Sequence, residues 1–205
     1  MKKMLKDAVI LFAITLAAGL ILGFVYQLTK EPIAAQELKA KQEAYKEVFA
    51  KADSFEAVED LGLTKANDML KEAGFGAAEL SDMVQRACDA QGNTLGYVLT
   101  VTTHEGYGGD IVFTMGITKD GILNGISILT ISETPGLGMK AESVLKPQFA
   151  GKAVEQFTYT KSGATTDSQI DAISGATITT NAMTNGVNAG LFYFRSTLQE
   201  GGKEE

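Results

Sequence analysis

The longest apolar stretch of the chain runs from Ala8 to Thr29, which is 22 residues without a charge. A helix of that length measures roughly 33 Å at about 1.5 Å per residue, and a hydrocarbon core is about 30 Å thick. A cleaved secretory signal is the alternative, but its apolar region is usually about 7–15 residues with a small-residue cleavage site close behind. The sequence Thr29-Lys30-Glu31-Pro32 offers no such site, so we predict a retained membrane anchor. Lys2, Lys3 and Lys6 precede it, which predicts a cytoplasmic N-terminus and an extracytoplasmic C-terminal domain.

Beyond the anchor, helical and strand-like patterns alternate. Segments with apolar residues at helical spacing are 31–52, 64–73 (ended by Gly74), 137–145 and 179–199, the last with Met183, Val187, Leu191 and Phe194 on one face. Segments typical of strands are 83–90, 95–103, 111–117, 122–131 and 157–160. The first four strands form two hairpin patterns, the second around the turn signal Asp120-Gly121. We predict an α+β fold, in which an N-terminal transmembrane helix is followed by a mainly antiparallel sheet with packed helices.

Composition narrows the possible chemistry. The chain carries a net charge of −7, of which about −9 falls beyond the anchor, so we expect no binding to nucleic acid. Cys88 is the only cysteine, which excludes an internal disulfide and a cysteine-ligated iron–sulfur cluster. His104 is the only histidine, which excludes a multi-histidine zinc or haem site. We expect no metal site, a small buried Cys88, a solvated His104, and an organic cofactor if the chain does redox chemistry.

Two loops between predicted elements have the residues of a ligand site. Gly106-Tyr107-Gly108-Gly109 contains three glycines, which permit close approach of the backbone to a ligand; a flexible hairpin loop is the structural alternative. Glu133-Thr134-Pro135-Gly136-Leu137-Gly138 is rigid, because Pro135 presets its φ and Gly136 suits the positive φ of a type II turn. A plain connector is the alternative for this second loop.

The sequence Ser-Gly-Ala-Thr occurs twice. Ser174-Gly175-Ala176-Thr177 follows Asp171 by three residues and precedes the last predicted helix, where converging N–H groups and the helix dipole suit a phosphate. The structural alternative is that Ser174 or Thr177 only caps that helix. In the upstream copy, Ser162-Gly163-Ala164-Thr165, Tyr159 occupies the position that corresponds to Asp171, and polar turn formers follow. We predict that the upstream copy is a loop between two strands.

The glycine loop, the Glu-Thr-Pro-Gly-Leu-Gly loop and the downstream motif occur in the same order in a known family. Together they resemble the FMN-binding domains of the Rnf and Nqr respiratory complexes, over most of the chain. The resemblance is closest to the G subunits of Rnf complexes; the C subunits of sodium-pumping NADH:quinone oxidoreductases are similar but have a longer ectodomain. The resemblance implies that Thr177 carries FMN through a phosphoester bond. It also implies that Asp171 is recognised or used by a magnesium-dependent flavin transferase with FAD as donor.

The same resemblance implies the remaining site residues. Ser174, Gly175 and Ala176 would form the turn before Thr177, and the chain would supply no catalytic residue, because the redox chemistry is the cofactor's own. We expect these residues to lie against or near the flavin ring: Glu133, Thr134, Leu137, Gly138, Tyr107 and Gly108.

These inferences predict an electron-carrying flavoprotein subunit of a membrane ion-translocating ferredoxin:NAD oxidoreductase, a redox subunit and not a complete enzyme. Its expected partners are the membrane, the other membrane and iron–sulfur subunits, and the transferase. The alternatives are the NqrC-type subunit of the sodium-pumping complex, a stand-alone extracytoplasmic electron shuttle, and a cofactor-free membrane-tethered binding domain. The expected segments are 1–29 (N-terminus and anchor), 30–82 (helical linker region), 83–199 (FMN-binding domain) and 200–205 (frayed tail).

Overall fold

The fold is described from a computed structural model, which covers residues 2–58 and 61–199. It divides into two compact units, Met1–Gln42 and Glu43–Glu205. The tail predicted at 200–205 lies outside the described residues.

One helix, α1 (Lys2–Val48), contains the whole predicted anchor. The helix predicted at 31–52 continues from the anchor without a break, with Pro32 inside it, and it ends at Val48, before the predicted end. Among the described residues, α1 is the helix that is long and apolar enough to cross a membrane, and no part of its most apolar stretch is buried in the protein. The length and composition of α1 therefore agree with the predicted anchor.

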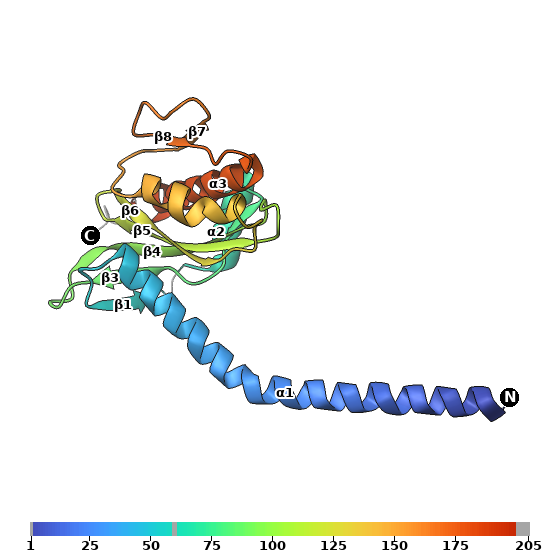
Figure 1. The fold of residues 1–205 in the computed structure, drawn as a ribbon. Coiled ribbons are helices and arrows are strands. Elements are labelled where there is room, and N and C mark those ends of the chain that lie inside the picture. Colours follow the sequence, from blue (N-terminus) through green and yellow to red (C-terminus); the bar gives the residue numbers. More distant parts are fainter. Residues whose placement is uncertain (1, 59–60, 200–205) are drawn as a thin grey trace. The chain divides into compact units, whose positions relative to one another are not determined.

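The second unit is built on an antiparallel sheet (Figure 1). The strands of this sheet are β1 (Ser54–Ala57), β2 (Ala78–Leu80), β3 (Gln85–Cys88), β4 (Thr94–Thr103), β5 (Ile111–Thr118) and β6 (Leu123–Thr130). Adjacent strands are hydrogen-bonded in the order β1-β3-β4-β5-β6, and β2 pairs with the C-terminal part of β4. Both predicted hairpins, β3–β4 and β5–β6, are confirmed, although β3 is shorter than expected. Residues 54–80, expected in a linker region, supply two strands of this sheet and α2 (Leu63–Glu72), which ends before Gly74 as predicted.

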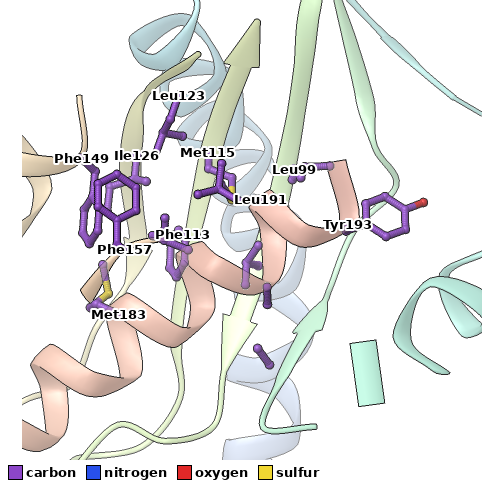
Figure 2. Packing of buried hydrophobic residues seen from close by; sticks show 14 of the residues in the cluster. Leu99, Phe113, Met115, Leu123, Ile126, Phe149, Phe157, Met183, Leu191 and Tyr193 are labelled. Atoms are coloured by element: carbon purple, nitrogen blue, oxygen red, sulfur yellow. The ribbon is translucent and has the colours of Figure 1, made fainter. Parts of the chain in front are cut away.

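The strand alternation separates two hydrophobic clusters, one on each face of the sheet. On one face, Phe113 and Met115 of β5 and Leu99 of β4 point toward α3 (Thr177–Tyr193), as Figure 2 shows. On the other face, Val98 packs with Ala87 of β3, with Val48 at the end of α1 and with Phe49, which follows that helix. Cys88 itself is buried, as predicted. The mainly antiparallel α+β fold is confirmed.

The C-terminal helix is more buried than its sequence pattern suggests. Met183, Val187, Leu191 and Phe194 are buried as predicted, but so are most other residues from Thr179 to Leu191. The interpretation of a one-sided amphipathic helix is therefore wrong. Gly186 and Gly190 explain the close packing, because a Cβ at either position would lie 3.0 Å or less from Phe113 or Met115. The predicted end near Gln199 is reached through a π-helical turn, η4 (Phe194–Gln199).

The helix predicted at 137–145 is not a regular α-helix. It consists of η1 (Gly138–Lys140), η2 (Ala141–Leu145) and η3 (Lys146–Phe149), which are 3₁₀, π and 3₁₀ turns. Pro147 explains the irregularity, because it has no N–H to donate and its ring clashes with the carbonyl group four residues earlier.

A small parallel sheet carries the upstream Ser-Gly-Ala-Thr copy. The strands are β7 (Thr158–Thr160), which was predicted, and β8 (Gln169–Asp171), which was not. The upstream copy, residues 162–165, lies in the loop that joins them, which confirms that prediction.

A partly exposed polar cluster fixes the last turn of α1 within the second unit. Lys146 Nζ lies 2.7 Å from Glu47 Oε1, and the Ser127 hydroxyl also donates to Glu47. Burial alone raises the pKa of the Glu47 carboxyl, but the hydrogen bonds from Lys146 and Ser127 outweigh it and hold that pKa below its ordinary value. The carboxylate therefore stays charged at neutral pH and connects α1 to both β6 and η3.

We expect Gly116→Ala to lower the free energy of unfolding by about 1–3 kcal/mol, because the added methyl group overpacks the contact with α1. A Cβ there would lie 2.8 Å from Val48 Cβ and 2.9 Å from the Val48 carbonyl oxygen. Gly76→Ala is the matched control, since its nearest neighbour would be Lys71 Cγ at 3.8 Å. Denaturant unfolding of the full chain in detergent measures both. Equal stability of the two variants would contradict the close contact.

Candidate functional site

The downstream motif forms a hydrogen-bonded turn at the start of α3. The Ala176 N–H donates to the Ile173 carbonyl at 3.1 Å, and Gly175 takes a positive φ of 78° inside the turn. Thr180, which is fully buried one turn into the helix, stabilises this turn through two hydrogen bonds. Its hydroxyl donates to the Ala176 carbonyl at 2.9 Å and accepts from the Ile173 N–H at 3.1 Å. Thr177, the first residue of α3, therefore projects from a rigid support.

The N-terminus of α3 has no side-chain cap among the described residues. The N-cap residue is Ala176, which has no side-chain acceptor, so the alternative in which Ser174 or Thr177 caps the helix is wrong. The first N–H groups of any α-helix lack intrahelical partners, and the helix dipole adds positive potential there. This end of α3 can therefore receive an anionic group beside the Thr177 hydroxyl.

Glu133 joins three segments of the site through one buried carboxylate. Its side chain is only 6% exposed. Oε2 accepts a hydrogen bond from the Thr179 hydroxyl at 3.0 Å, and Oε1 accepts one from the Gly108 N–H at 3.2 Å. The carboxylate thus holds the glycine loop and the first turn of α3 at fixed positions on either side of its own loop.

The loop after β6 is the rigid turn that its sequence predicts. The Leu137 N–H donates to the Thr134 carbonyl at 3.1 Å, and Gly136 has a φ of 78°. Gly138 then allows the loop to lie against α3, because a Cβ there would come within 2.6 Å of both Glu133 Oε2 and Thr179 Oγ1. Glycine at this position is required for the close approach of the two segments.

A cavity of about 530 Å³ opens between these segments. Most of the residues predicted from the sequence line it: Tyr107, Glu133, Thr134, Leu137, Gly138, Gly175, Ala176 and Thr177. Ile178 and Thr179 also line it and were not predicted. Apolar side chains surround the opening, since Tyr107 is 70% exposed, Ile178 51% and Leu137 42%. The cavity is therefore mainly apolar, with the Glu133 carboxylate and threonine hydroxyls as its polar groups.

A second cavity of about 260 Å³ borders the same turn. Thr177 and Gly175 line both cavities. The predicted Ser174 lines only the second, together with Ala172, Ile173 and Lys161, which were not predicted. Gly108 lines neither cavity and acts through its hydrogen bond to Glu133. Asp171 also lines neither, and its carboxylate accepts a hydrogen bond from the Ala164 N–H at 2.7 Å.

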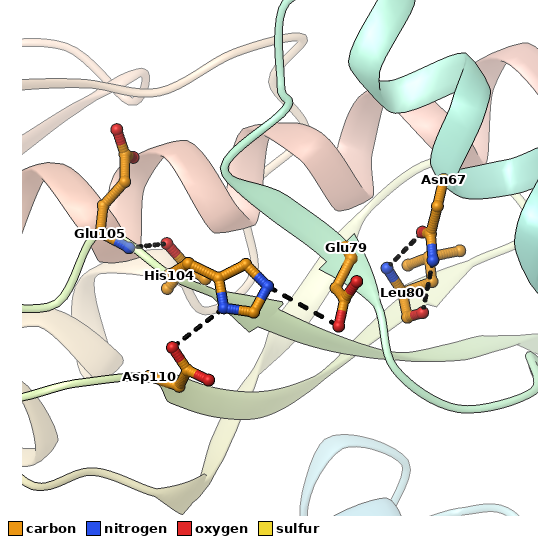
Figure 3. A network of polar contacts seen from close by, with 7 residues as sticks. Asn67, Glu79, Leu80, His104, Glu105 and Asp110 are labelled. Carbon is orange, nitrogen blue, oxygen red and sulfur yellow. Dashed lines mark hydrogen bonds and ion pairs between the residues drawn. The ribbon is translucent and has the colours of Figure 1, made fainter.

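The glycine loop is closed at its base by the only histidine (Figure 3). His104 Nδ1 lies 2.9 Å from Asp110 Oδ1 across the loop, and Nε2 lies 3.7 Å from Glu79 Oε1 of β2. Next to it, Glu105 accepts a hydrogen bond from Asn185 of α3 at 2.7 Å. His104 is exposed, as predicted, and it positions the loop without lining the cavity.

The missed residues carry weak signals in the sequence. Thr179 donates a hydrogen bond to Glu133, which lies 46 positions earlier in the sequence, and no local sequence pattern predicts such a long-range pair. Ile178 was visible only as the residue after the motif. Lys161 follows a short predicted strand and lies 16 residues before Thr177, so only the folded β7–β8 pair brings the two to one cavity.

Two family models and several known proteins match this chain. The FMN-binding domain family matches residues 106–191, and the RnfG N-terminal region matches residues 1–48. The G subunit of the Na(+)-translocating ferredoxin:NAD(+) oxidoreductase complex of Acetobacterium woodii is 31% identical, over 95% of this chain and 93% of that protein. The G subunit of the proton-translocating complex of Clostridium ljungdahlii is 30% identical, over 89% and 90%.

Two solved structures are also similar. The C subunit of the Na(+)-translocating NADH-quinone reductase from Parabacteroides distasonis is 21% identical, covers 70% of this chain and 76% of its own, and has a TM-score of 0.48. NqrC of Shewanella oneidensis is 19% identical, covers 55% and 57%, and has a TM-score of 0.45.

The described residues fit an FMN. Small-molecule pockets usually measure about 300–1,000 Å³ and combine apolar walls with a few polar groups, as the larger cavity does. At Gly175 a Cβ would lie 3.1 Å from Leu137 Cδ2, so a glycine there leaves space between the Leu137 side chain and the turn. The uncapped end of α3 suits the phosphate, while the apolar walls suit the ring.

We expect Glu133→Ala to lower the free energy of unfolding by about 1–3 kcal/mol, because the Gly108 N–H and the Thr179 hydroxyl lose their acceptor. Glu133→Gln retains an acceptor oxygen for Gly108 and can donate to Thr179, so its loss should be clearly smaller. Denaturant unfolding of the flavin-free full chain in detergent compares the two variants. If Glu133→Ala matched the wild type, the carboxylate would not hold these segments together.

Proposed function

This chain belongs to the family of G subunits of Rnf-type ion-translocating oxidoreductase complexes, and on that basis we propose that it carries FMN covalently on Thr177. In this proposal FMN is joined to the Thr177 hydroxyl through a phosphoester bond, and the chain transfers electrons as one redox subunit of the membrane complex. The chain anchors to the membrane through α1. Three lysines before the anchor support a cytoplasmic N-terminus and an extracytoplasmic flavin domain.

The observation that carries this proposal is the position of Thr177. It begins an uncapped helix of 17 residues and lies on the wall of a cavity large enough for a flavin ring. The residues around it match the FMN-binding domain family. A hydroxyl in this place lets the phosphate sit at the positive end of α3 while the ring enters the larger cavity.

Attachment requires a donor and an enzyme, which we propose to be FAD and a magnesium-dependent flavin transferase. Thr177 Oγ loses its proton and forms a bond to the phosphorus of the FMN half of FAD. The pyrophosphate P–O bond breaks, and AMP leaves with the electron pair of that bond. A covalent link prevents loss of the cofactor outside the cell.

Once attached, FMN supplies the electron-transfer chemistry, and the chain sets its surroundings. We propose that Leu137, Ile178 and Tyr107 contact the ring and keep water from it. Glu133 places a negative charge beside the ring, which opposes the addition of electrons. The other subunits of the complex, including membrane and iron–sulfur subunits, would be donor and acceptor.

The family assignment favours this function over the alternatives. The relatives that are about 30% identical along nearly the whole chain are G subunits of Rnf-type complexes, and not NqrC-type subunits of the sodium-pumping complex. A stand-alone electron shuttle has no need of a partner complex, whereas the G-subunit relatives are all named as parts of one. The cofactor-free binding domain relied on a capping role for Ser174 or Thr177, and Ala176 occupies the N-cap position instead.

We expect Thr177→Val to abolish the covalent flavin, because valine keeps the shape of threonine but has no nucleophilic oxygen. Thr165→Val is the matched control in the upstream copy, where the hydroxyl donates to Gln169 at 3.0 Å and lines neither cavity. The measurement is the intact mass of full chain expressed in membranes with the transferase, followed by peptide mapping. Loss of flavin in Thr165→Val alone would show that the upstream copy carries the modification. A wild-type mass equal to that of the bare polypeptide would contradict the proposed function.

We expect Glu133→Gln to raise the midpoint potential of the bound flavin by on the order of tens of millivolts, because a nearby negative charge is removed.

Leu137→Ala should shift the flavin absorption bands, because water gains access to the ring. Ile122→Ala is the control for truncation of a half-exposed apolar side chain, since Ile122 is 38% exposed and lines neither cavity. Redox titration and absorption spectra of the loaded full chain measure these effects. An unchanged potential and spectrum in both site variants would place the ring elsewhere.

A further inference from the structure

The second cavity is not needed to hold a flavin ring, yet it shares Thr177 with the larger cavity. Of the six described residues that line it, Lys161 alone carries a charge. Ser174 adds a hydroxyl group, and the other four are Ala172, Ile173, Gly175 and Thr177 itself. A small cavity that combines an ammonium group and a hydroxyl with the proposed attachment oxygen has the chemistry of a phosphate site.

The backbone next to Lys161 is fixed. Thr160, just before it, pairs with Asp171 in the parallel β7–β8 sheet, and the Ala172 N–H donates to the Thr160 carbonyl at 2.8 Å. Lys161 and Ala172 therefore enter the same cavity from adjacent strand ends. No carboxylate of the described residues forms an ion pair with Lys161, whereas Lys152 at the other end of this region pairs with Asp167.

We propose that the second cavity holds the phosphate of the Thr177 phosphoester and that Lys161 supplies its counter-charge. This inference rests on the proposed function, and it adds a residue that the motif does not contain. The phosphoester keeps one negative charge, shared by its two free oxygens. The Lys161 ammonium faces that charge from the β7–β8 side, while the N–H groups of α3 face it from the helix side. During attachment, the same ammonium group stabilises the negative charge on the phosphoryl oxygens while the Thr177 Oγ–P bond forms.

Asp171 acts in this arrangement as a positioning residue. Its carboxylate accepts from the Ala164 N–H at 2.7 Å, which fastens the loop that begins with Lys161. An asparagine at 171 retains a carbonyl oxygen for this hydrogen bond, whereas an alanine does not. The pair of substitutions therefore separates positioning from any role that requires the negative charge.

The test is the initial rate of covalent flavin incorporation into the full chain in detergent, with purified transferase, FAD and Mg²⁺, followed by intact mass. We expect Lys161→Gln to reduce the rate about threefold to tenfold at low salt, as for loss of a partly exposed charge-assisted contact. The deficit should shrink toward about 1 M salt, where the Debye length falls to roughly 3 Å. Lys161→Arg should restore most of the rate, and Lys119→Gln, the same charge change in the β5–β6 turn, should have no effect.

Asp171→Ala should load slowly and Asp171→Asn at close to the wild-type rate, with unfolding temperatures recorded for every variant. If wild type loads on Thr177 but Lys161→Gln loads equally fast, the phosphate role of Lys161 is overturned while the proposed function stands. A deficit in Lys161→Gln that neither salt nor arginine changes would also overturn it. If Asp171→Asn loads as slowly as Asp171→Ala, the carboxylate acts through its charge and the positioning role is wrong. A wild-type chain that gains no mass would instead refute the proposed function.

Discussion

The site depends on one buried carboxylate whose hydrogen bonds come from neutral groups. Glu133 accepts from the Gly108 backbone 25 positions earlier and from the Thr179 hydroxyl 46 positions later. A buried carboxylate is costly unless its oxygens receive hydrogen bonds, so the glycine loop and the first turn of α3 must stay where they are. Gly138 is part of the same constraint, since only a residue without a Cβ lets the two segments approach. The hydrogen bonds of this one side chain therefore hold together the segments between which the cavity opens.

The rest of the fold supplies rigidity to the same point. α3 is buried along nearly its whole length, and Gly186 and Gly190 let it lie close on β5. A helix that is buried along most of its surface cannot shift its first turn without disturbing the core. Thr180 adds local stiffness by closing the turn before Thr177. A cofactor attached there would have a fixed point of attachment, and its ring would be limited by the cavity walls and not by motion of the helix.

The sequence predicted the regular elements and the motifs well, and it failed where contacts are long-range. Alternating strands and the Asp120-Gly121 turn report local geometry, so both hairpins were predicted correctly. The amphipathic interpretation of α3 failed because small residues, such as Gly186, allow burial on faces that look polar or neutral. The irregular helix around Pro147 was missed because its apolar spacing resembles an α-helix. Thr179 and Lys161 were missed because only the folded chain brings them to the cavities.

The two Ser-Gly-Ala-Thr copies show why four letters do not define a site. Both have a glycine with positive φ, at Gly163 and Gly175, so the local turn chemistry is alike. The upstream copy ends in an exposed loop, where the Thr165 hydroxyl is used by Gln169 and no long helix begins. The downstream copy ends at the uncapped start of a buried helix, and its threonine lines two cavities. The carboxylate of Asp171, which precedes the second copy, accepts a hydrogen bond from the Ala164 N–H of the first copy. None of residues 162–165 lines either cavity, and of the loop that carries the upstream copy only Lys161 does. The upstream copy therefore shares its letters with the site without sharing its place in the fold.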